Sequence, residues 1–459
     1  MSDRQRHNGR ELLLAALAHE PVPTVPWVPF AGVHAGKLTG MDATTVLTDA
    51  NALVASLLQV NALYDPDGQP VVFDLQLEAE ILGCELAWAN KAPPSVATHP
   101  FSNTKALPDA LPERHQGRLP IVLEAMARMK AAVGDRTALY GLICGPLTLA
   151  SHLRGTELFM DMFDDPDYVA ALLAYTTRVN ERMAELYVEA GMDVIGCVDP
   201  LVSQVSPRTF RSFLDAPLRS LFGGLRERGV LSSLFVCGDA TKNIEVMCQT
   251  APDAIYIDEN IDLVMAKRIT DEHNITIGGN IPLTTVMLLG SQQDNIKWVV
   301  DTLEAVDPHN YILAPGCDMP YDCPIDNVIG VAQAVRDPER FRAVVAHYQA
   351  PEIDYQIEIP DYASLRKPLM EVFTLDSDTC AACSYMLSAA QRAVSEMAGQ
   401  VDMVEYKITV PENIARMKKM GISNLPCILV DGVVAFSSII PGNRELLSLL
   451  GHAISRRRG

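Results

Sequence analysis

The sequence predicts an α/β protein in two parts: a (β/α)8 barrel of parallel strands, followed by a smaller α/β domain. The chain has 459 residues, which is too long for one ordinary core. From Asp193 onward short apolar runs alternate with helical spans, as in parallel sheets with crossover helices. Because this pattern changes after His347, we expect a barrel over 1–347, a linker over 348–367 and a second domain over 368–459.

About eight short apolar runs supply the expected barrel strands, the first of them at 22–29 between prolines. Eight is the number that closes a (β/α) barrel. A doubly wound open sheet is the main competitor, but the glycine-rich phosphate turn of that fold is missing after the first strand. The other strands are expected at 71–74, 138–144, 193–198, 231–237, 254–257, 275–278 and 310–314.

Composition and charge fit a soluble globular enzyme. Hydrophobic residues make up 48% and charged residues 20% of the chain, and the formal net charge is −20. Such a charge argues against nucleic acid and anionic membranes as partners. Neither a membrane span of ~20 apolar residues nor a signal peptide is evident, so we expect a cytoplasmic protein. Its ten cysteines are then mostly reduced, and clustered ones indicate metal binding or redox catalysis.

Two cysteines follow predicted strands at equivalent places. Cys237 ends the run LSSLFVC, and Cys317 follows YILA within APGC. Because the carboxyl ends of barrel strands meet at one mouth, where barrel enzymes do their chemistry, this pair could hold a metal ion. The alternative is that both are small residues filling strand ends.

Other polar residues also fall at predicted strand ends and would converge on the same mouth. Asp74 and Asp199 are predicted to contact a polar substrate, although Asp199, which precedes a proline, could instead cap a helix. Asn280 follows two glycines and could reach the ligand, and His152 is a further candidate for substrate contact or for packing. The remaining polar strand ends are His34, Asp239 and Asp258.

The last 90 or so residues contain a dithiol motif, Cys380-Ala-Ala-Cys383, which follows an expected strand at 369–375 and opens a helix. The helix terminus stabilises the first thiolate, and the second thiol can resolve a mixed disulfide. Half of a zinc site is the alternative, but only Cys427 is offered as a further ligand. Later elements predict a β-α-β-α-β-β-α order. The segment resembles a minimal thioredoxin-like domain, in which a cis-proline at Leu425-Pro426 would lie beside the dithiol.

Residues 1–347 resemble the uroporphyrinogen decarboxylase superfamily, and within it the cobalamin-dependent methyltransferase branch. That superfamily implies a (β/α)8 barrel, in agreement with the strand count. The shared motifs occur in order along the region: GRELLLAALAHEPVPTVPWVP, FDLQLEAEILGCEL, YGLICGPLTLASHLRG (140–155), CVDPLVSQVSPRTF (197–210), FVCGDATKNI (235–244), IGGNIP (277–282) and APGCDMPYDCPIDNV (314–328).

Two features separate the branches. Decarboxylases of this superfamily carry an arginine-rich segment after the first strand, where this chain reads FAGVHAGKLTG, and they lack a cysteine at the last strand. In the methyltransferases a His-x-Cys pair and a later cysteine bind zinc, which activates a thiol acceptor or polarises the methyl-bearing group. Cys237 and Cys317 match that pattern, but Phe235 occupies the histidine position. The candidates to replace the missing ligand are His34, His152, Asp239, Glu78 and Cys323, and without metal the two cysteines could be redox-active.

The resemblance therefore implies a corrinoid-dependent methyltransferase. Its barrel would move a methyl group to or from a cobalamin carried by a partner corrinoid protein, with a small molecule such as a thiol as acceptor or donor. The attached dithiol domain would supply redox chemistry. One rival is a tetrapyrrole decarboxylase, which the missing arginine segment disfavours. The other is a thiol–disulfide oxidoreductase whose barrel binds its client.

Overall fold

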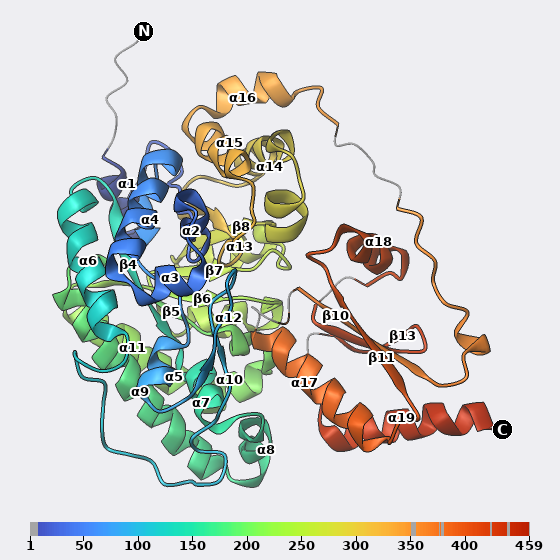
Figure 1. Ribbon diagram of the computed structural model, residues 1–459. Coiled ribbons are helices and arrows are strands. Elements are labelled where there is room, and N and C mark those ends of the chain that lie inside the picture. The colour runs from blue at the N-terminus through green and yellow to red at the C-terminus, as the bar shows by residue number, and fades with distance from the viewer. Residues whose placement is uncertain are drawn as a thin grey trace. The chain divides into compact units, whose positions relative to one another are not determined.

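The computed structural model describes residues 8–349, 355–375, 377, 381–422, 425–437 and 441–458. The chain forms two compact units, of which the first holds most of the residues up to Tyr348 and the second those from Gln349 onward. In the first unit the strands lie inside and the helices outside (Figure 1).

Seven strands of the first unit form one sheet in the order β1-β4-β5-β6-β7-β8-β9, and every neighbouring pair is parallel. The predicted strands at 138–144 and 254–257 agree residue for residue with β4 and β7. Their bounds are β1 (Gly68–Pro70), β4 (Ala138–Cys144), β5 (Val194–Val198), β6 (Leu231–Val236), β7 (Ala254–Ile257), β8 (Thr276–Ile281) and β9 (Tyr311–Pro315).

The second expected strand lies three residues too late in the sequence. Val71, Val72 and Phe73 are buried, which made them resemble a strand, but the ladder with β4 covers Gly68–Pro70. The apolar run is the continuation of β1 into the barrel interior. The buried apolar run and the residues of the strand ladder are therefore not the same residues in this segment.

The first expected strand closes the barrel through a single bridge, which Trp27 makes with Leu313 of β9. The Val28 N–H donates to the Leu313 carbonyl at 2.9 Å, and the Trp27 carbonyl accepts from the Asp67 N–H, just before β1, at 2.9 Å. Prolines at 23, 26 and 29 remove N–H donors and keep this segment from forming a longer strand. The chain nevertheless occupies the eighth position between β9 and β1, as the strand count predicted.

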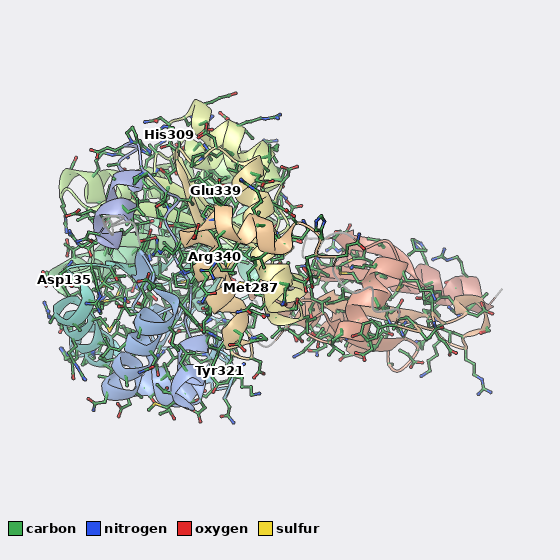
Figure 2. All side chains as sticks on the ribbon, turned by 90° about the horizontal axis from the view of Figure 1, so that it is seen from above. Asp135, Met287, His309, Tyr321, Glu339 and Arg340 are labelled. Atoms are coloured by element: carbon green, nitrogen blue, oxygen red, sulfur yellow. A yellow bond between two sulfur atoms is a disulfide. The ribbon has the colours of Figure 1, made fainter. Side chains whose placement is uncertain are left out.

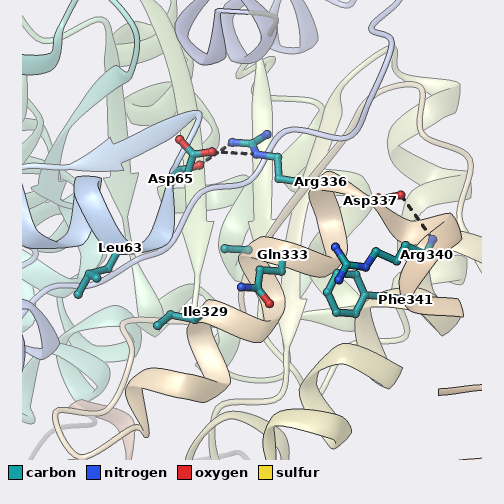
Figure 3. Close-up of a pocket in the computed structure, with 9 residues that line it drawn as sticks. Leu63, Asp65, Ile329, Gln333, Arg336, Asp337, Arg340 and Phe341 are labelled. Atoms are coloured by element: carbon teal, nitrogen blue, oxygen red, sulfur yellow. Dashed lines mark hydrogen bonds and ion pairs between the residues drawn. The ribbon is translucent and has the colours of Figure 1, made fainter. Parts of the chain in front are cut away.

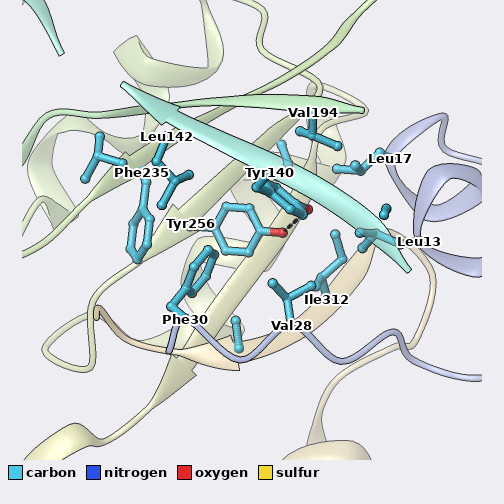
Figure 4. Packing of buried hydrophobic residues seen from close by; sticks show 14 of the residues in the cluster. Leu13, Leu17, Val28, Phe30, Tyr140, Leu142, Val194, Phe235, Tyr256 and Ile312 are labelled. Atoms are coloured by element: carbon cyan, nitrogen blue, oxygen red, sulfur yellow. Dashed lines mark hydrogen bonds between the residues drawn. The ribbon is translucent and has the colours of Figure 1, made fainter. Parts of the chain in front are cut away.

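Aromatic side chains fill the barrel interior. Phe30, Tyr140, Phe235 and Tyr256 belong to one buried cluster, and Figure 4 shows their rings grouped inside the strands. The hydroxyl groups of Tyr140 and Tyr256 lie 2.7 Å apart and form a hydrogen bond within this apolar core. The barrel is therefore packed and not a pore.

Helices surround the strands, and several of them begin at recognisable signals such as proline in the first turn or the capping box of Ser291 and Asp294. No described helix has the length and apolar character needed to span a bilayer. The helices are α1 (Gly9–Leu17), α2 (His34–Thr39), α3 (Ala43–Thr48), α4 (Ala50–Tyr64), α5 (Leu77–Ile81), α6 (Leu119–Val133), α7 (Pro146–Arg154), α8 (Glu157–Asp164), α9 (Pro166–Glu189), α10 (Pro207–Phe213), α11 (Asp215–Glu227), α12 (Ile244–Cys248), α13 (Leu263–Glu272), α14 (Gln292–Ala305), α15 (Ile325–Arg336) and α16 (Pro338–Val345). Shorter elements are β2 (Leu86–Ala87), β3 (Ser95–Val96), η1 (Pro200–Gln204), η2 (Thr241–Asn243) and η3 (Leu283–Leu288).

The second unit holds a four-stranded sheet in the order β11-β10-β12-β13, in which only β10 and β11 are parallel. Helices α17 and α19 pack on one face, whereas Ile414 of α18 packs on the other. The expected β-α-β-α-β-β-α order is confirmed, and the Leu425–Pro426 peptide is cis as predicted. The elements are η4 (Tyr362–Ser364), β10 (Leu369–Thr374), α17 (Ala381–Glu396), β11 (Asp402–Lys407), α18 (Pro411–Lys419), β12 (Cys427–Val430), β13 (Val433–Ser437) and α19 (Asn443–Arg458).

Barrel closure at Trp27 can be tested by truncating its side chain. Trp27 is fully buried, and its indole N–H donates to the Tyr64 carbonyl at 3.2 Å. We expect Trp27→Ala to lower the free energy of unfolding of the barrel by about 3–5 kcal/mol, measured by urea denaturation. The matched control is Trp88→Ala, because Trp88 is 39% exposed. Equal losses in the two variants would contradict a closing role for Trp27.

Candidate functional site

Cys237 and Cys317 meet at the carboxyl end of the barrel. Cys237 follows β6 and Cys317 lies two residues after β9. Their Cα atoms are 6.0 Å apart, and the structure joins their sulfur atoms in a disulfide. Strands β7 and β8 separate β6 from β9 in the sheet, so the two cysteines approach each other across the mouth. The sequence predicted this convergence from the strand ends alone.

An aromatic floor lies under this pair, made of Phe30, Phe73, Phe235 and Tyr256. Phe235 is central to it, with its ring centroid 4.8 Å from that of Phe30, 5.8 Å from that of Phe73 and 5.5 Å from that of Tyr256. Cys237 and Cys317 pack against the same cluster. The position at which the resemblance implies a histidine ligand is therefore occupied by an apolar ring in a packed core.

The donors near the mouth do not fit a zinc site. A catalytic zinc needs three protein ligands, and the part of the chain that the structure describes contains no group of three histidine, cysteine, aspartate or glutamate side chains suited to a metal ion. His34 is fully engaged. Its Nδ1 donates to the Tyr321 carbonyl at 3.1 Å, and its Nε2 accepts from the Tyr64 hydroxyl at 2.8 Å.

The other proposed replacements for the missing ligand also have protein partners. The Cys323 thiol donates to the Met287 carbonyl at 3.2 Å, and burial raises its pKa to about 12. Asp239 accepts from the Thr241 N–H at 3.1 Å. His152 lies with Nδ1 3.9 Å from the Cys144 sulfur, and burial lowers its pKa to about 4. None of these side chains completes a tetrahedral set with the two cysteines.

Asp74 forms a buried ion pair that the sequence did not predict. Its carboxylate lies 2.6 Å from Nη1 of Arg118, whose Nε lies 2.7 Å from Glu80. Arg118 immediately precedes α6, and its guanidinium lies 4.9 Å from the Trp88 ring. Arg118 belongs to an irregular, proline-rich stretch without a repeating pattern, and no local signal pointed to it. Substrate contact by Asp74 remains a prediction.

Asp199 caps a helix. It accepts hydrogen bonds from the Leu147 N–H at 2.9 Å and from the N–H and hydroxyl of Thr148 at 3.0 Å and 2.6 Å. These groups belong to the first turn of α7, not to the segment after Pro200. Burial raises the pKa of Asp199 to about 6. The geometry agrees with the capping alternative, and a substrate contact by Asp199 stays a prediction.

Asn280 positions the loop after β7. Its amide donates to the carbonyls of Asp258 and Ile261, at 3.0 Å and 2.8 Å. Asp258 in turn accepts from the Gly238 N–H at 2.8 Å, directly after Cys237. Asn280 thus supports the loops that hold the cysteine pair, whereas its predicted contact with a ligand is untested.

Glu78, one of the candidate metal ligands, is a buried carboxyl group on α5. One of its oxygens accepts from the Cys144 N–H at 3.0 Å, and the other has no hydrogen-bond partner among the described residues. Burial raises the pKa of Glu78 to about 8. The folded protein therefore holds a proton on Glu78 at neutral pH, where an unfolded glutamate would be ionised.

The pKa of Glu78 predicts a pH-dependent stability. The bound proton stabilises the fold fully below the ordinary pKa of 4.5, and this contribution is lost as the pH rises to about 8. Up to about 1.4 kcal/mol per pH unit should come from this single group. We expect Glu78→Gln to flatten the decline in unfolding free energy measured by urea denaturation across this range. Exposed Glu85→Gln is the control, and an unchanged slope in Glu78→Gln would contradict the assignment.

A groove of about 360 Å³ lies away from the mouth, against α4 and α15 (Figure 3). Arg336 lines it and forms a 2.8 Å ion pair with Asp67, next to β1 at the amino end of the strands. Arg340, which also lines the groove, and Glu339 are exposed on α16 (Figure 2). Because it lies at the amino end of the strands, this groove is separate from the cysteine pair.

The chain is similar to a known protein family and to several known methyltransferases. The family description "Uroporphyrinogen decarboxylase (URO-D)" matches residues 8–338. The chain is 25% identical over 336 residues to "Methylcobamide:CoM methyltransferase MtbA" of Methanosarcina acetivorans, covering 72% of this chain and 97% of that protein. It is 29% identical over 338 residues to "Methylcobamide:CoM methyltransferase MtaA" of Methanosarcina barkeri, covering 70% of this chain and 96% of that protein. A solved "methyltransferase from Methanosarcina mazei" superposes with a TM-score of 0.66 at 25% identity, covering 72% of this chain and 99% of that one.

Proposed function

Because the chain belongs to the uroporphyrinogen decarboxylase (URO-D) family, we propose that its barrel is a corrinoid-dependent methyltransferase. It moves a methyl group between a cobalamin, carried by a separate corrinoid protein, and a small thiol. The observation that carries this proposal is the similarity to two proteins named methylcobamide:CoM methyltransferases, which extends over 97% and 96% of their lengths.

The charge of the mouth disfavours the rival activity, decarboxylation of a tetrapyrrole. Such a substrate carries several carboxylates, which cationic side chains must hold. Lys37, in the segment where decarboxylases carry arginines, donates to the carbonyls of Asp322 and Cys323 at 2.7 Å and 2.9 Å. Arg118 is already paired with Asp74 and Glu80. The cationic side chains that a decarboxylase would use to bind substrate carboxylates therefore already have partners within the protein.

Methyl transfer between the two substrates does not require a covalent intermediate on the protein. The acceptor thiol releases its proton to solvent, its sulfur attacks the methyl group of the corrinoid substrate, and the electron pair of the cobalt–carbon bond stays on cobalt. The chain provides a mouth whose aromatic floor excludes water from the methyl group. Asp74, held by Arg118, is proposed to orient the polar end of the small substrate. No step is assigned to zinc, because the donor set does not fit that metal.

The second unit is proposed to be a thioredoxin-like redox domain. Its mixed sheet, its helix order and the cis-proline before β12 support this assignment. Cys383 lies in the first turn of α17, and its buried sulfur accepts from the Leu375 N–H at 3.4 Å. Its partner in the motif, Cys380, lies outside the described residues. We propose that this dithiol keeps thiols of the methyl-transfer system reduced.

A methyl-transfer assay tests the proposed function. Purified protein under reducing conditions is expected to demethylate methylcobalamin in the presence of small thiols, followed through the cobalamin absorption spectrum. We expect Asp74→Asn to lower kcat/KM by about 10–100-fold and Glu80→Gln, at the outer side of the same arginine, by less than about threefold. Absence of transfer to any thiol, together with release of carbon dioxide from a tetrapyrrole, would overturn the assignment.

A further inference from the structure

The barrel mouth carries two sulfur atoms that the fold brings together without a third metal ligand. We propose that Cys237 and Cys317 form a reversible disulfide, a redox centre of the barrel itself that a dithiol reduces. This inference stands on the geometry of the two strand ends and does not depend on the proposed methyl transfer.

The backbone around each cysteine is held in place by other loops. The Gly238 N–H, next to Cys237, donates to Asp258 at 2.8 Å. On the other side, the Gly316 N–H donates to the Ile281 carbonyl at 3.0 Å, and Asp318 accepts from the Gly32 N–H at 2.7 Å. These bonds fix the Cα atoms 6.0 Å apart, within the range that a disulfide requires. The bond can therefore form and break without movement of the strands.

Accessibility distinguishes this pair from the other described cysteines. Cys237 and Cys317 are partly exposed. Burial raises the pKa of both Cys248 and Cys323 to about 12, which makes these thiols unreactive at neutral pH. A reagent in solution can therefore reach the mouth pair, whereas the buried thiols are shielded from it. The buried cysteines are Cys84, Cys144, Cys197, Cys248, Cys323, Cys383 and Cys427.

Phe235 leaves the two cysteines without a third ligand for a zinc ion. A histidine at this position would add an imidazole to the two thiols, whereas the phenylalanine ring is 1% exposed and packed among other aromatic side chains. Two thiols without a further donor cannot form the three-ligand catalytic site that zinc prefers. The two thiols can instead react with each other and form a disulfide.

The redox step is an ordinary thiol–disulfide exchange. A thiolate of the reducing dithiol attacks one sulfur, the Cys237–Cys317 bond breaks, and a mixed disulfide forms while the other cysteine takes up a proton. The second thiol of the reductant then displaces the first cysteine. Two electrons and two protons pass to the barrel cysteines, and the reductant leaves as a disulfide. A small dithiol in solution and the CAAC motif of the same chain are two sources of this chemistry.

Peptide mapping of the full-length protein tests the proposal. Native protein equilibrated in air is alkylated with iodoacetamide, before or after treatment with dithiothreitol, and digested for mass spectrometry. We expect the Cys237 and Cys317 peptides to be linked in air and their alkylation to rise at least about tenfold after dithiothreitol. Cys237→Ser should leave Cys317 open to alkylation without reductant, whereas the buried control Cys248→Ser should leave the link intact.

Two results would overturn the proposal: complete alkylation of both cysteines in air, or a link that dithiothreitol breaks only after the protein is unfolded. A further arm identifies the reductant. Under limiting dithiothreitol, a rate of reduction at least about threefold slower in the Cys380→Ser, Cys383→Ser double variant assigns the step to the CAAC motif. Equal rates assign it to the dithiol in solution. Either rate supports a reversible barrel disulfide.

Discussion

The closure of the barrel at Trp27 is the constraint on which the rest of the structure depends. This short segment bonds to β9 on one side and to the backbone before β1 on the other. Without closure, β6 and β9 would be separated by two intervening strands along an open sheet. Because the ring closes, their carboxyl ends face each other, and Cys237 and Cys317 come within bonding distance.

The side chains around the two sulfur atoms then determine whether the barrel mouth can bind a metal ion. Phe235 contributes a packed aromatic floor where the family resemblance implies a zinc ligand. His34 and Cys323, which could have compensated, are committed to hydrogen bonds with other groups. Phe235 is therefore the reason that the chain shares the fold of the family but lacks the ligand set that the resemblance implies for zinc.

Much of the barrel could be predicted because its strands are short apolar runs with abrupt ends. The runs at β4 and β7 are bounded on both sides, and their limits agree with the sequence. The strand β1 was misplaced because the apolar run lies at Val71–Phe73, just after it, whereas the ladder with β4 covers Gly68–Pro70, which carries no such run. The prolines before Trp27 predicted an extended segment, but its reduction to one bridge follows from missing N–H donors.

The side-chain partners at the mouth were harder to predict because they come from distant parts of the chain. Arg118 is 44 residues from Asp74 and belongs to an irregular stretch. Asp199 caps a helix that begins 53 residues earlier, at Pro146. The convergence of the two cysteines was predictable because it needs only strand order. Whether they bind a metal or react with each other was left open, because it depends on which third group the fold places beside them.

The zinc content of the purified protein tests the central claim, that these two sulfurs pair with each other and not with a metal. Atomic emission would be measured on protein produced with added zinc, for the wild type and for Cys237→Ser and Cys317→Ser. We expect no stoichiometric zinc that depends on either cysteine. One zinc ion per chain in the wild type, lost in both variants, would contradict it.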